Sequence, residues 1–240
     1  MLRFAGVPAA HHSKPAATSS SPPGNTPGQG HPSSKPGPSA SASPQPSSSA
    51  PVSLTGQASL SLSVTSGRIA AGTNDTFTGQ LTDKSGGVAD ASVNLLERAA
   101  GQRAWHQAGT STTGANGTAV ITAPDLTMNA AFRLSGPDGT VSRPVLVIVI
   151  PPVSAEVSSS GGMTSKITAS SPLAAPGDTV VLQVLSGKHW MNLQLAKLNG
   201  ASQAQFMVRS RLMQRRYQVV LLPTASHGLS VSNAVTVPPR

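Results

Sequence analysis

The sequence contains no cysteine among its 240 residues. Disulfide bonds, thiolate metal sites and a cysteine nucleophile are therefore excluded, and the composition suits either redox compartment. Aromatic residues are also scarce, with two Trp, one Tyr and four Phe. Stability must then come from packing in which a few large side chains close each hydrophobic core.

Acidic residues are few as well, with eight Asp and Glu in total. A catalytic centre needs acid, base or nucleophilic groups that converge, and a calcium site needs clustered carboxylates. The sequence shows neither pattern. The histidines also lack metal-ligand spacing; they are His11, His12, His31, His106, His189 and His227. We therefore predict that the protein is not an enzyme and binds no cofactor or metal.

No hydrophobic run approaches the roughly 20 residues that a membrane span requires. The N-terminal MLRFAGVPAA is shorter than the apolar region of a secretory signal, so taken literally the sequence carries no export signal and no anchor. Two interpretations stay open: the stretch ends a signal or anchor that begins upstream of Met1, or it is an ordinary N-terminus. The proline-bounded run VLVIVI at 145–150 predicts a strand buried on both faces.

Residues 1–57 consist mainly of Ser, Pro, Ala and Gly. Such a segment buries too little apolar surface to offset the entropy of ordering it. Its prolines favour extended stretches that Gly and Ser loosen. The sequence predicts a disordered, Ser/Pro-rich stalk.

Beyond residue 57, apolar and polar residues alternate between Gly, Asn and Asp turns, which is typical of half-buried strands. The expected fold class is all-β. Seven strands are expected at 58–64, 75–82, 91–97, 104–112, 117–122, 130–135 and 141–150. Seven more are expected at 153–157, 163–170, 179–185, 188–197, 202–208, 215–222 and 229–237.

Two aromatic pairs indicate an internal repeat. Trp105 precedes Phe132 by 27 positions, and Trp190 precedes Tyr217 by the same 27. The two tryptophans are 85 positions apart, a longer period than solenoid or propeller units have, so each copy should be a complete β-sandwich. The predicted domains are the stalk at 1–57, one sandwich at 58–152 and a second at 153–240.

The aromatic residues beyond the stalk are the best candidates to fill the space between paired sheets. The predicted structural core residues are Phe77, Trp105, Phe132, Trp190, Phe206 and Tyr217. For the two tryptophans a second interpretation stays open, an exposed platform on which a sugar ring stacks. As core residues, either would cost about 3–5 kcal/mol when truncated to Ala.

Positive charge is concentrated in the second copy. Residues 58–152 carry six basic and six acidic residues, whereas 153–240 carry eight basic residues against Glu156 and Asp178. Four of these bases fall within eight positions, in the connection before the sixth strand and at its start: Arg209, Arg211, Arg215 and Arg216.

Three interpretations of this arginine cluster stay open. It is a solvated loop, or it binds an anionic polymer of the cell envelope such as teichoic acid or phosphorylated glycan, because guanidinium forks suit phosphate. Nucleic acid is the least favoured partner, since stacking residues and a groove motif are missing.

The stretches GDTVVLQVLSGKHW, NGASQAQF and RRYQVVLL resemble bacterial immunoglobulin-like domains (Big or fibronectin-like) of secreted and envelope proteins in high-GC Gram-positive bacteria. Residues 58–152 resemble the same family through GGVADASVNLLER, GQRAWHQ and GANGTAVI. The resemblance implies two tandem immunoglobulin-like β-sandwiches and an extracellular or envelope location. Its motifs are structural, so it implies no activity.

The expected function is a non-catalytic extracellular or envelope-associated spacer or adhesion module. Its expected partner is anionic wall polymer, a glycan or another surface protein. An alternative is the accessory carbohydrate-binding region of a secreted hydrolase. Intracellular nucleic-acid binding is a third candidate and the least favoured.

Overall fold

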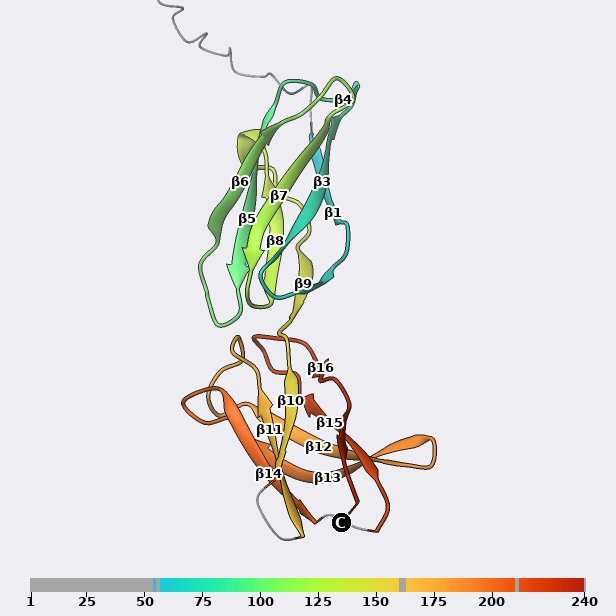
Figure 1. The fold of residues 1–240 in the computed structure, drawn as a ribbon. Helices are drawn as coiled ribbons and strands as arrows, with labels where there is room; N and C mark the ends of the chain where they lie inside the picture. Colours follow the sequence, from blue (N-terminus) through green and yellow to red (C-terminus); the bar gives the residue numbers. More distant parts are fainter. Residues whose placement is uncertain (1–53, 55–56, 160–162, 210–211, 240) are drawn as a thin grey trace, which may run out of the picture. The chain divides into compact units, whose positions relative to one another are not determined.

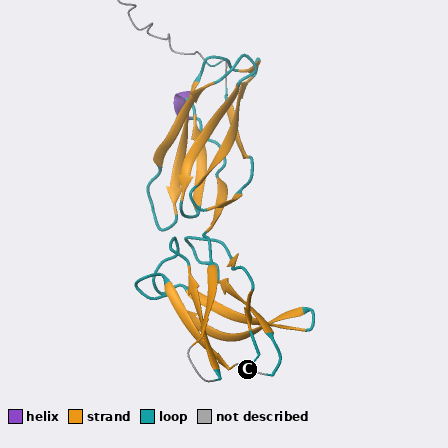
Figure 2. Ribbon diagram, viewed as in Figure 1, coloured by secondary structure: helices purple, strands orange, loops and turns teal. Residues whose placement is uncertain are grey.

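The computed structural model describes residues 54, 57–159, 163–209 and 212–239. Apart from Leu54 and Gln57, the predicted stalk lies outside the described residues. The described chain folds into strands joined by loops (Figure 1). A single 3-10 turn, η1 (Pro137–Gly139), interrupts the strands of this described part (Figure 2). The predicted all-β fold class is confirmed.

The first sandwich is formed by two sheets. In one sheet, β3 pairs with β1, β4 and β7. The other sheet has the strand order β2-β9-β8-β5-β6. The strands are β1 (Ser59–Val64), β2 (Arg68–Ala70), β3 (Thr73–Asp83), β4 (Gly86–Gly87), β5 (Ser92–Ala99), β6 (His106–Thr112), β7 (Thr118–Leu126), β8 (Ala130–Ser135) and β9 (Val145–Ile150).

The core of this sandwich is closed by an aromatic contact between the two sheets. Phe77 on β3 and Phe132 on β8 have ring centroids 4.5 Å apart, and both side chains are buried. Gly79, two residues after Phe77, leaves room for Leu134 from the facing sheet, because a Cβ at Gly79 would lie 2.2 Å from Leu134 Cδ1. Strand alternation therefore directs one row of side chains from each sheet into a shared core.

The second sandwich repeats this arrangement. One sheet has the strand order β10-β11-β14. The other sheet has the strand order β13-β12-β15-β16, and β17 also pairs with β15. The strands are β10 (Ser154–Ser159), β11 (Thr164–Ser170), β12 (Thr179–Ser186), β13 (His189–Lys197), β14 (Gln203–Arg209), β15 (Arg215–Leu221), β16 (Ser230–Val231) and β17 (Val235–Val237).

The order β6-β5-β8 in the first sandwich matches β13-β12-β15 in the second. Phe132 on β8 and Tyr217 on β15 are buried at corresponding places, in two hydrophobic clusters that share no residue. Phe206 on β14 belongs to the second cluster. The fold is thus two tandem immunoglobulin-like β-sandwiches, as the sequence predicted.

The observed strand β9 differs from the strand predicted at 141–150. It begins at Val145 and alternates, with Val147 and Val149 fully buried and Leu146 58% exposed. Burial on both faces is therefore wrong, because the outer face of this sheet has no second sheet packed on it. The strand expected at 229–237 is divided into β16 and β17, and the short strands β2 and β4 were not predicted.

The structure also corrects the placement of both tryptophans. Trp105 and Trp190 are only half-buried and belong to neither core cluster. Trp105 immediately precedes β6 and Trp190 lies on β13, and each of these strands is an edge of its sheet. Trp190 pairs with Leu185, which alternates with the buried Val184, so its ring faces away from the core, and Trp105 packs against Arg98 and Arg133 outside the core.

We predict that Phe132→Ala destabilises the first sandwich by about 3–5 kcal/mol, since it opens a cavity in the core. Trp105→Ala should cost clearly less, about 1–2 kcal/mol, because it mainly removes two cation–π contacts of about 0.5–1 kcal/mol each. Chemical denaturation followed by far-UV circular dichroism measures both. A loss at Trp105 equal to the loss at Phe132 would contradict this placement.

Candidate functional site

Three arginines of the sequence-predicted cluster meet at one end of the second sandwich. Arg209 is the last residue of β14 and pairs with Thr164 at the start of β11. Arg215 and Arg216 begin β15 and pair with the end of β17. All three are exposed, and Arg211 lies outside the described residues. We call Arg209, Arg215 and Arg216 the basic end. Arg209 belongs to a strand rather than to the connection in which the sequence analysis placed it.

The two carboxylates of the second sandwich lie away from the basic end. Glu156 is in the middle of β10, opposite Thr168. Asp178 precedes β12 at the end opposite to Tyr217, whose partner on β12 is Val184. No ion pair joins an arginine of the basic end to a carboxylate of the described residues. The positive charge of this end is therefore not neutralised within the described chain.

Apolar side chains are also exposed beside the basic end. Leu212 and Met213, between β14 and β15, are 91% and 77% exposed. Met163, next to the Thr164–Arg209 pair, is 72% exposed. These side chains add contact area around the guanidinium groups.

Trp105 forms a second cluster, on the outer face of the first sandwich. The guanidinium carbon of Arg98 lies 4.8 Å from the centroid of the Trp105 ring, and that of Arg133 lies 4.3 Å from it. Arg98 comes from β5 and Arg133 from β8, adjacent strands of one sheet. No ion pair joins either arginine to a carboxylate within the described chain. We call Trp105, Arg98 and Arg133 the stacked cluster.

Glu97 lies beside Arg98 in sequence but alternates to the other side of β5, opposite His106 on β6. Burial raises the pKa of Glu97 above its ordinary value, and the positive charge of His106 partly offsets that rise. The charge influence on this carboxyl therefore comes from His106. Glu97 does not act as a counter-ion for the stacked cluster.

Asn129, between β7 and β8, links the two sandwiches. Its backbone N–H donates to the Ser226 carbonyl over 2.7 Å, and its Nδ2 donates to the Ala225 carbonyl over 3.0 Å. Its Oδ1 accepts the backbone N–H of Val149 over 2.8 Å. The side chain is 7% exposed, so these bonds are well shielded from water.

The loop at 222–229, between β15 and β16, makes the other contacts of this link. The Gly228 N–H donates to the Val149 carbonyl over 2.8 Å, and Arg68 Nη2 donates to the Leu229 carbonyl over 3.2 Å. A Cβ at Gly228 would lie 2.6 Å from Ile148 Cγ2. The loop therefore packs so closely against β9 that a side chain at position 228 would require Ile148 to shift.

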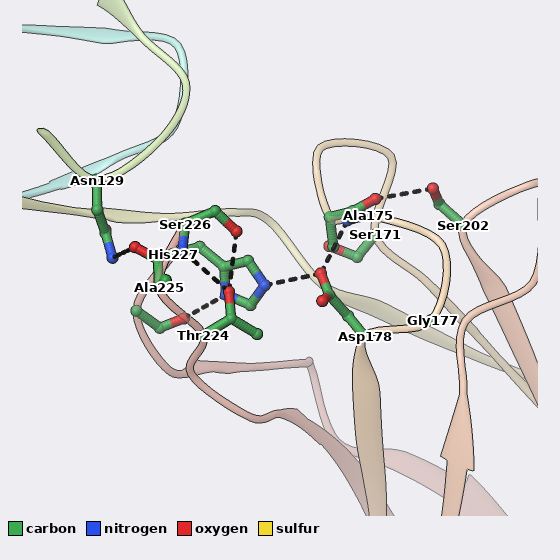
Figure 3. A network of polar contacts seen from close by, with 12 residues as sticks. Asn129, Ser171, Ala175, Gly177, Asp178, Ser202, Thr224, Ala225, Ser226 and His227 are labelled. Atoms are coloured by element: carbon green, nitrogen blue, oxygen red, sulfur yellow. Dashed lines mark hydrogen bonds and ion pairs between the residues drawn. The ribbon is translucent and has the colours of Figure 1, made fainter. Parts of the chain in front are cut away.

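His227 fixes this loop within the second sandwich (Figure 3). Its Nε2 lies 2.9 Å from Oδ2 of Asp178, and its Nδ1 lies 3.0 Å from the Gly228 carbonyl. A carbonyl only accepts, so Nδ1 carries a proton, and Nε2 either donates to an ionised Asp178 or accepts from a protonated one. The His227 side chain is 4% exposed. The pair connects the loop to the residue that precedes β12.

Sequence reasoning missed these contacts. His227 and Asp178 are 49 positions apart, and Asn129 and Ala225 are 96 apart, so no local pattern connects them. His106 and His189 are exposed and lie singly on their strands. No group of three or more His, Asp or Glu that could hold a metal occurs among the described residues. Within the same residues, no helix has the length and apolar character to cross a membrane.

No family model and no curated protein matches the sequence. Three of the solved structures with a similar fold are given as examples. They are the Yersinia pseudotuberculosis adhesin InvE (17% identity, TM-score 0.38, covering 74% of this chain and 58% of that one), a tetra-tandem repeat in the extending region of a large adhesion protein (10%, 0.40, 77% and 50%), and the human OSCAR ligand-binding domain (13%, 0.29, 75% and 98%).

This chain thus spans 58% and 50% of the two adhesion proteins. Likenesses with TM-scores of 0.40 and below support no argument about what the chain binds. The surfaces of this chain therefore provide the basis for a function.

We predict that the double variant Asn129→Ala/Gly228→Val releases the two sandwiches from each other. It removes the Asn129 side-chain bonds, leaves the Val149 N–H unpaired at a cost of about 1–3 kcal/mol, and forces a Cβ against Ile148. NMR relaxation should then give separate rotational correlation times for the two sandwiches. Asn233→Ala is the matched control, because Asn233 makes two side-chain bonds to Ala155 inside the second sandwich. Unchanged relaxation in the double variant would refute the link.

Proposed function

We propose that the protein is a non-catalytic spacer and adhesion module at the cell envelope or outside the cell, and that its basic end holds an anionic wall polymer. The observation that carries the proposal is the basic end itself. Three exposed guanidinium groups share one end of a sandwich that has no described acid there.

The chemistry of arginine supports a phosphate-bearing partner. Guanidinium groups offer parallel N–H donors that match phosphate oxygens. An exposed charge pair contributes only about 0–1 kcal/mol, so a single small anion would bind weakly. A polymer that presents many phosphates lets several arginines engage at once and raises the effective concentration of the next contact. The basic end therefore suits a polymer better than a free ion.

The link between the sandwiches supports a spacer role. A spacer must hold its binding end at a defined distance from its point of attachment, and hydrogen bonds between Asn129 and the 222–229 loop restrict motion where the two sandwiches join. The resemblance to bacterial immunoglobulin-like domains supports an extracellular or envelope location and an origin in high-GC Gram-positive bacteria.

The half-buried position of Trp105 favours one alternative, an accessory carbohydrate-binding region that works beside a catalytic partner. A sugar platform requires a ring that solvent reaches, and Trp105 is partly exposed, with Arg98 and Arg133 over its ring. The two functions use different surfaces of the molecule.

The test compares two triple variants of the full chain that change the net charge equally. Arg209→Glu/Arg215→Glu/Arg216→Glu reverses the basic end, and Lys84→Glu/Arg143→Glu/Lys197→Glu reverses exposed charges elsewhere. We expect the first to weaken retention on purified Gram-positive cell wall about tenfold, since three contacts of about 0.5 kcal/mol are lost. The second should bind within about twofold of the unmodified protein.

Salt and a soluble competitor complete this test. Retention should fall between about 50 and 200 mM salt, because the contacts are screened and counterions are released. Poly(glycerol phosphate) should compete for binding. If reversal of the basic end leaves retention unchanged and insensitive to salt, the polymer contact is wrong.

A further inference from the structure

The stacked cluster concentrates positive charge without a counter-ion among the described residues. The guanidinium carbons of Arg98 and Arg133 lie 4.8 and 4.3 Å from one ring centroid, so they are separated by no more than the sum of these distances, 9.1 Å. Two like charges this close repel each other. The negative face of the indole offsets part of that repulsion, but no carboxylate of the described residues pairs with either group.

We propose that the stacked cluster is a binding site for an acidic sugar, in which the two guanidinium groups hold a carboxylate or phosphate and the adjoining apolar surface packs against the sugar ring. This site lies in the first sandwich. It is separate from the basic end and does not depend on the function proposed above.

An unpaired donor supports an anionic ligand. Arg133 Nε is buried and has no hydrogen-bond partner among the described residues. Arg133 is half-buried, whereas Arg98 is exposed. A buried donor without an acceptor is unfavourable, so a shift of the Arg133 side chain that lets an anion oxygen reach Nε would be favourable. Stacking on the indole also restricts the guanidinium planes before a ligand arrives, which lowers the entropy cost of binding.

The neighbouring surface supports a sugar rather than a bare ion. Arg98 lies directly opposite Ala131, and Ala131 lies opposite Leu146, so these three residues form one row across β5, β8 and β9. Leu146 is 58% exposed and Trp105 is half-exposed. An exposed row of small and apolar side chains beside an aromatic ring is a surface on which the C–H face of a sugar packs.

A shallow hollow adjoins this row. Its volume is about 280 Å³, and its lining includes Arg98, Gln102, Ala131 and Leu146 of the first sandwich and Ala225 of the second, whereas Trp105 and Arg133 lie outside this lining. This volume is slightly below the range of about 300–1,000 Å³ for pockets that hold drug-sized ligands. The hollow therefore suits one or two sugar units of a chain that continues into solvent. Gln102, an exposed residue of this lining, carries an amide that can hydrogen-bond a sugar hydroxyl.

The second sandwich provides an internal comparison. Trp190 occupies the corresponding place in the repeat and is also half-buried. Within the described chain, the cation–π contacts involve Trp105 and not Trp190. A tryptophan at this place is thus a shared feature of the two copies, whereas the stacked arginine pair is particular to the first. The arginine pair of the site therefore belongs to the first sandwich, and the second sandwich contributes only Ala225 to the adjoining hollow.

The experiment measures binding of the full chain by isothermal titration calorimetry. The probes are polygalacturonate, which carries carboxylates, dextran phosphate, which carries phosphates on sugar rings, and dextran, which is neutral. The unmodified protein should bind at least one acidic probe, and dextran should not bind. The probe that binds identifies which acidic group the site prefers.

The variants are Trp105→Ala and Arg98→Gln/Arg133→Gln, with Trp190→Ala and Lys84→Gln/Arg143→Gln as matched controls. We expect each variant of the stacked cluster to raise the Kd for the bound probe at least tenfold, and each control to stay within twofold. Far-UV circular dichroism checks that Trp105→Ala remains folded, and Trp105→Phe should restore part of the affinity because a smaller aromatic face is retained.

Three results would overturn the proposal: binding of neither acidic probe, equal binding of dextran, or affinity that depends on the arginines but not on Trp105. Charge reversal of the basic end separates this proposal from the function proposed above. That triple variant should leave calorimetric binding of polygalacturonate at the stacked cluster intact while it weakens retention on cell wall. If it abolishes binding of every acidic probe, the stacked cluster is not the site.

Discussion

Contact between the two sheets of the first sandwich determines where its surface side chains point. Phe77 and Phe132 meet between the sheets with ring centroids 4.5 Å apart. Successive residues of a strand face opposite sides, so an inward Phe132 requires an outward Arg133. On β5 the buried Leu95 has the same effect and directs Arg98 outward. The packing of the core therefore brings two arginines to one outer face, although they lie far apart in sequence.

Periodicity was sufficient to predict most of this architecture. Alternation located the main strands, and the spacing of Trp105, Phe132, Trp190 and Tyr217 indicated the repeat, because both depend on residues close in sequence. The same signals do not distinguish a central strand from an edge strand. Both tryptophans were therefore assigned to the core, although they lie at sheet edges. The spacing of aromatic residues thus indicates a repeated sandwich, but it does not show whether a given aromatic side chain is buried.

The count of charged residues did not reveal the stacked cluster, for a similar reason. The first sandwich carries equal numbers of acidic and basic residues, which suggested an electrostatically neutral domain. Pairing of β5 with β8 nevertheless places Arg98 and Arg133 around one ring, while Glu97 faces His106. Net charge is a sum over the sequence, whereas a ligand responds to the charges within a few ångströms of it. Long-range contacts such as His227 with Asp178 were unpredictable for the same reason, since sheet pairing and loop packing create them.

The two arginine surfaces differ in the physical source of their affinity. The basic end consists of exposed arginines: Arg209, Arg215 and Arg216. Each arginine loses side-chain entropy when it binds, and water screens its charge. Affinity at this end must therefore come from many weak contacts. Arg98 and Arg133 are held against an indole, so part of that entropy is already lost before binding. A polymer that reached both surfaces would bind with an effective concentration set by the distance between them. Because the Asn129 and Gly228 contacts restrict that distance, the link between the sandwiches would control avidity without touching the ligand.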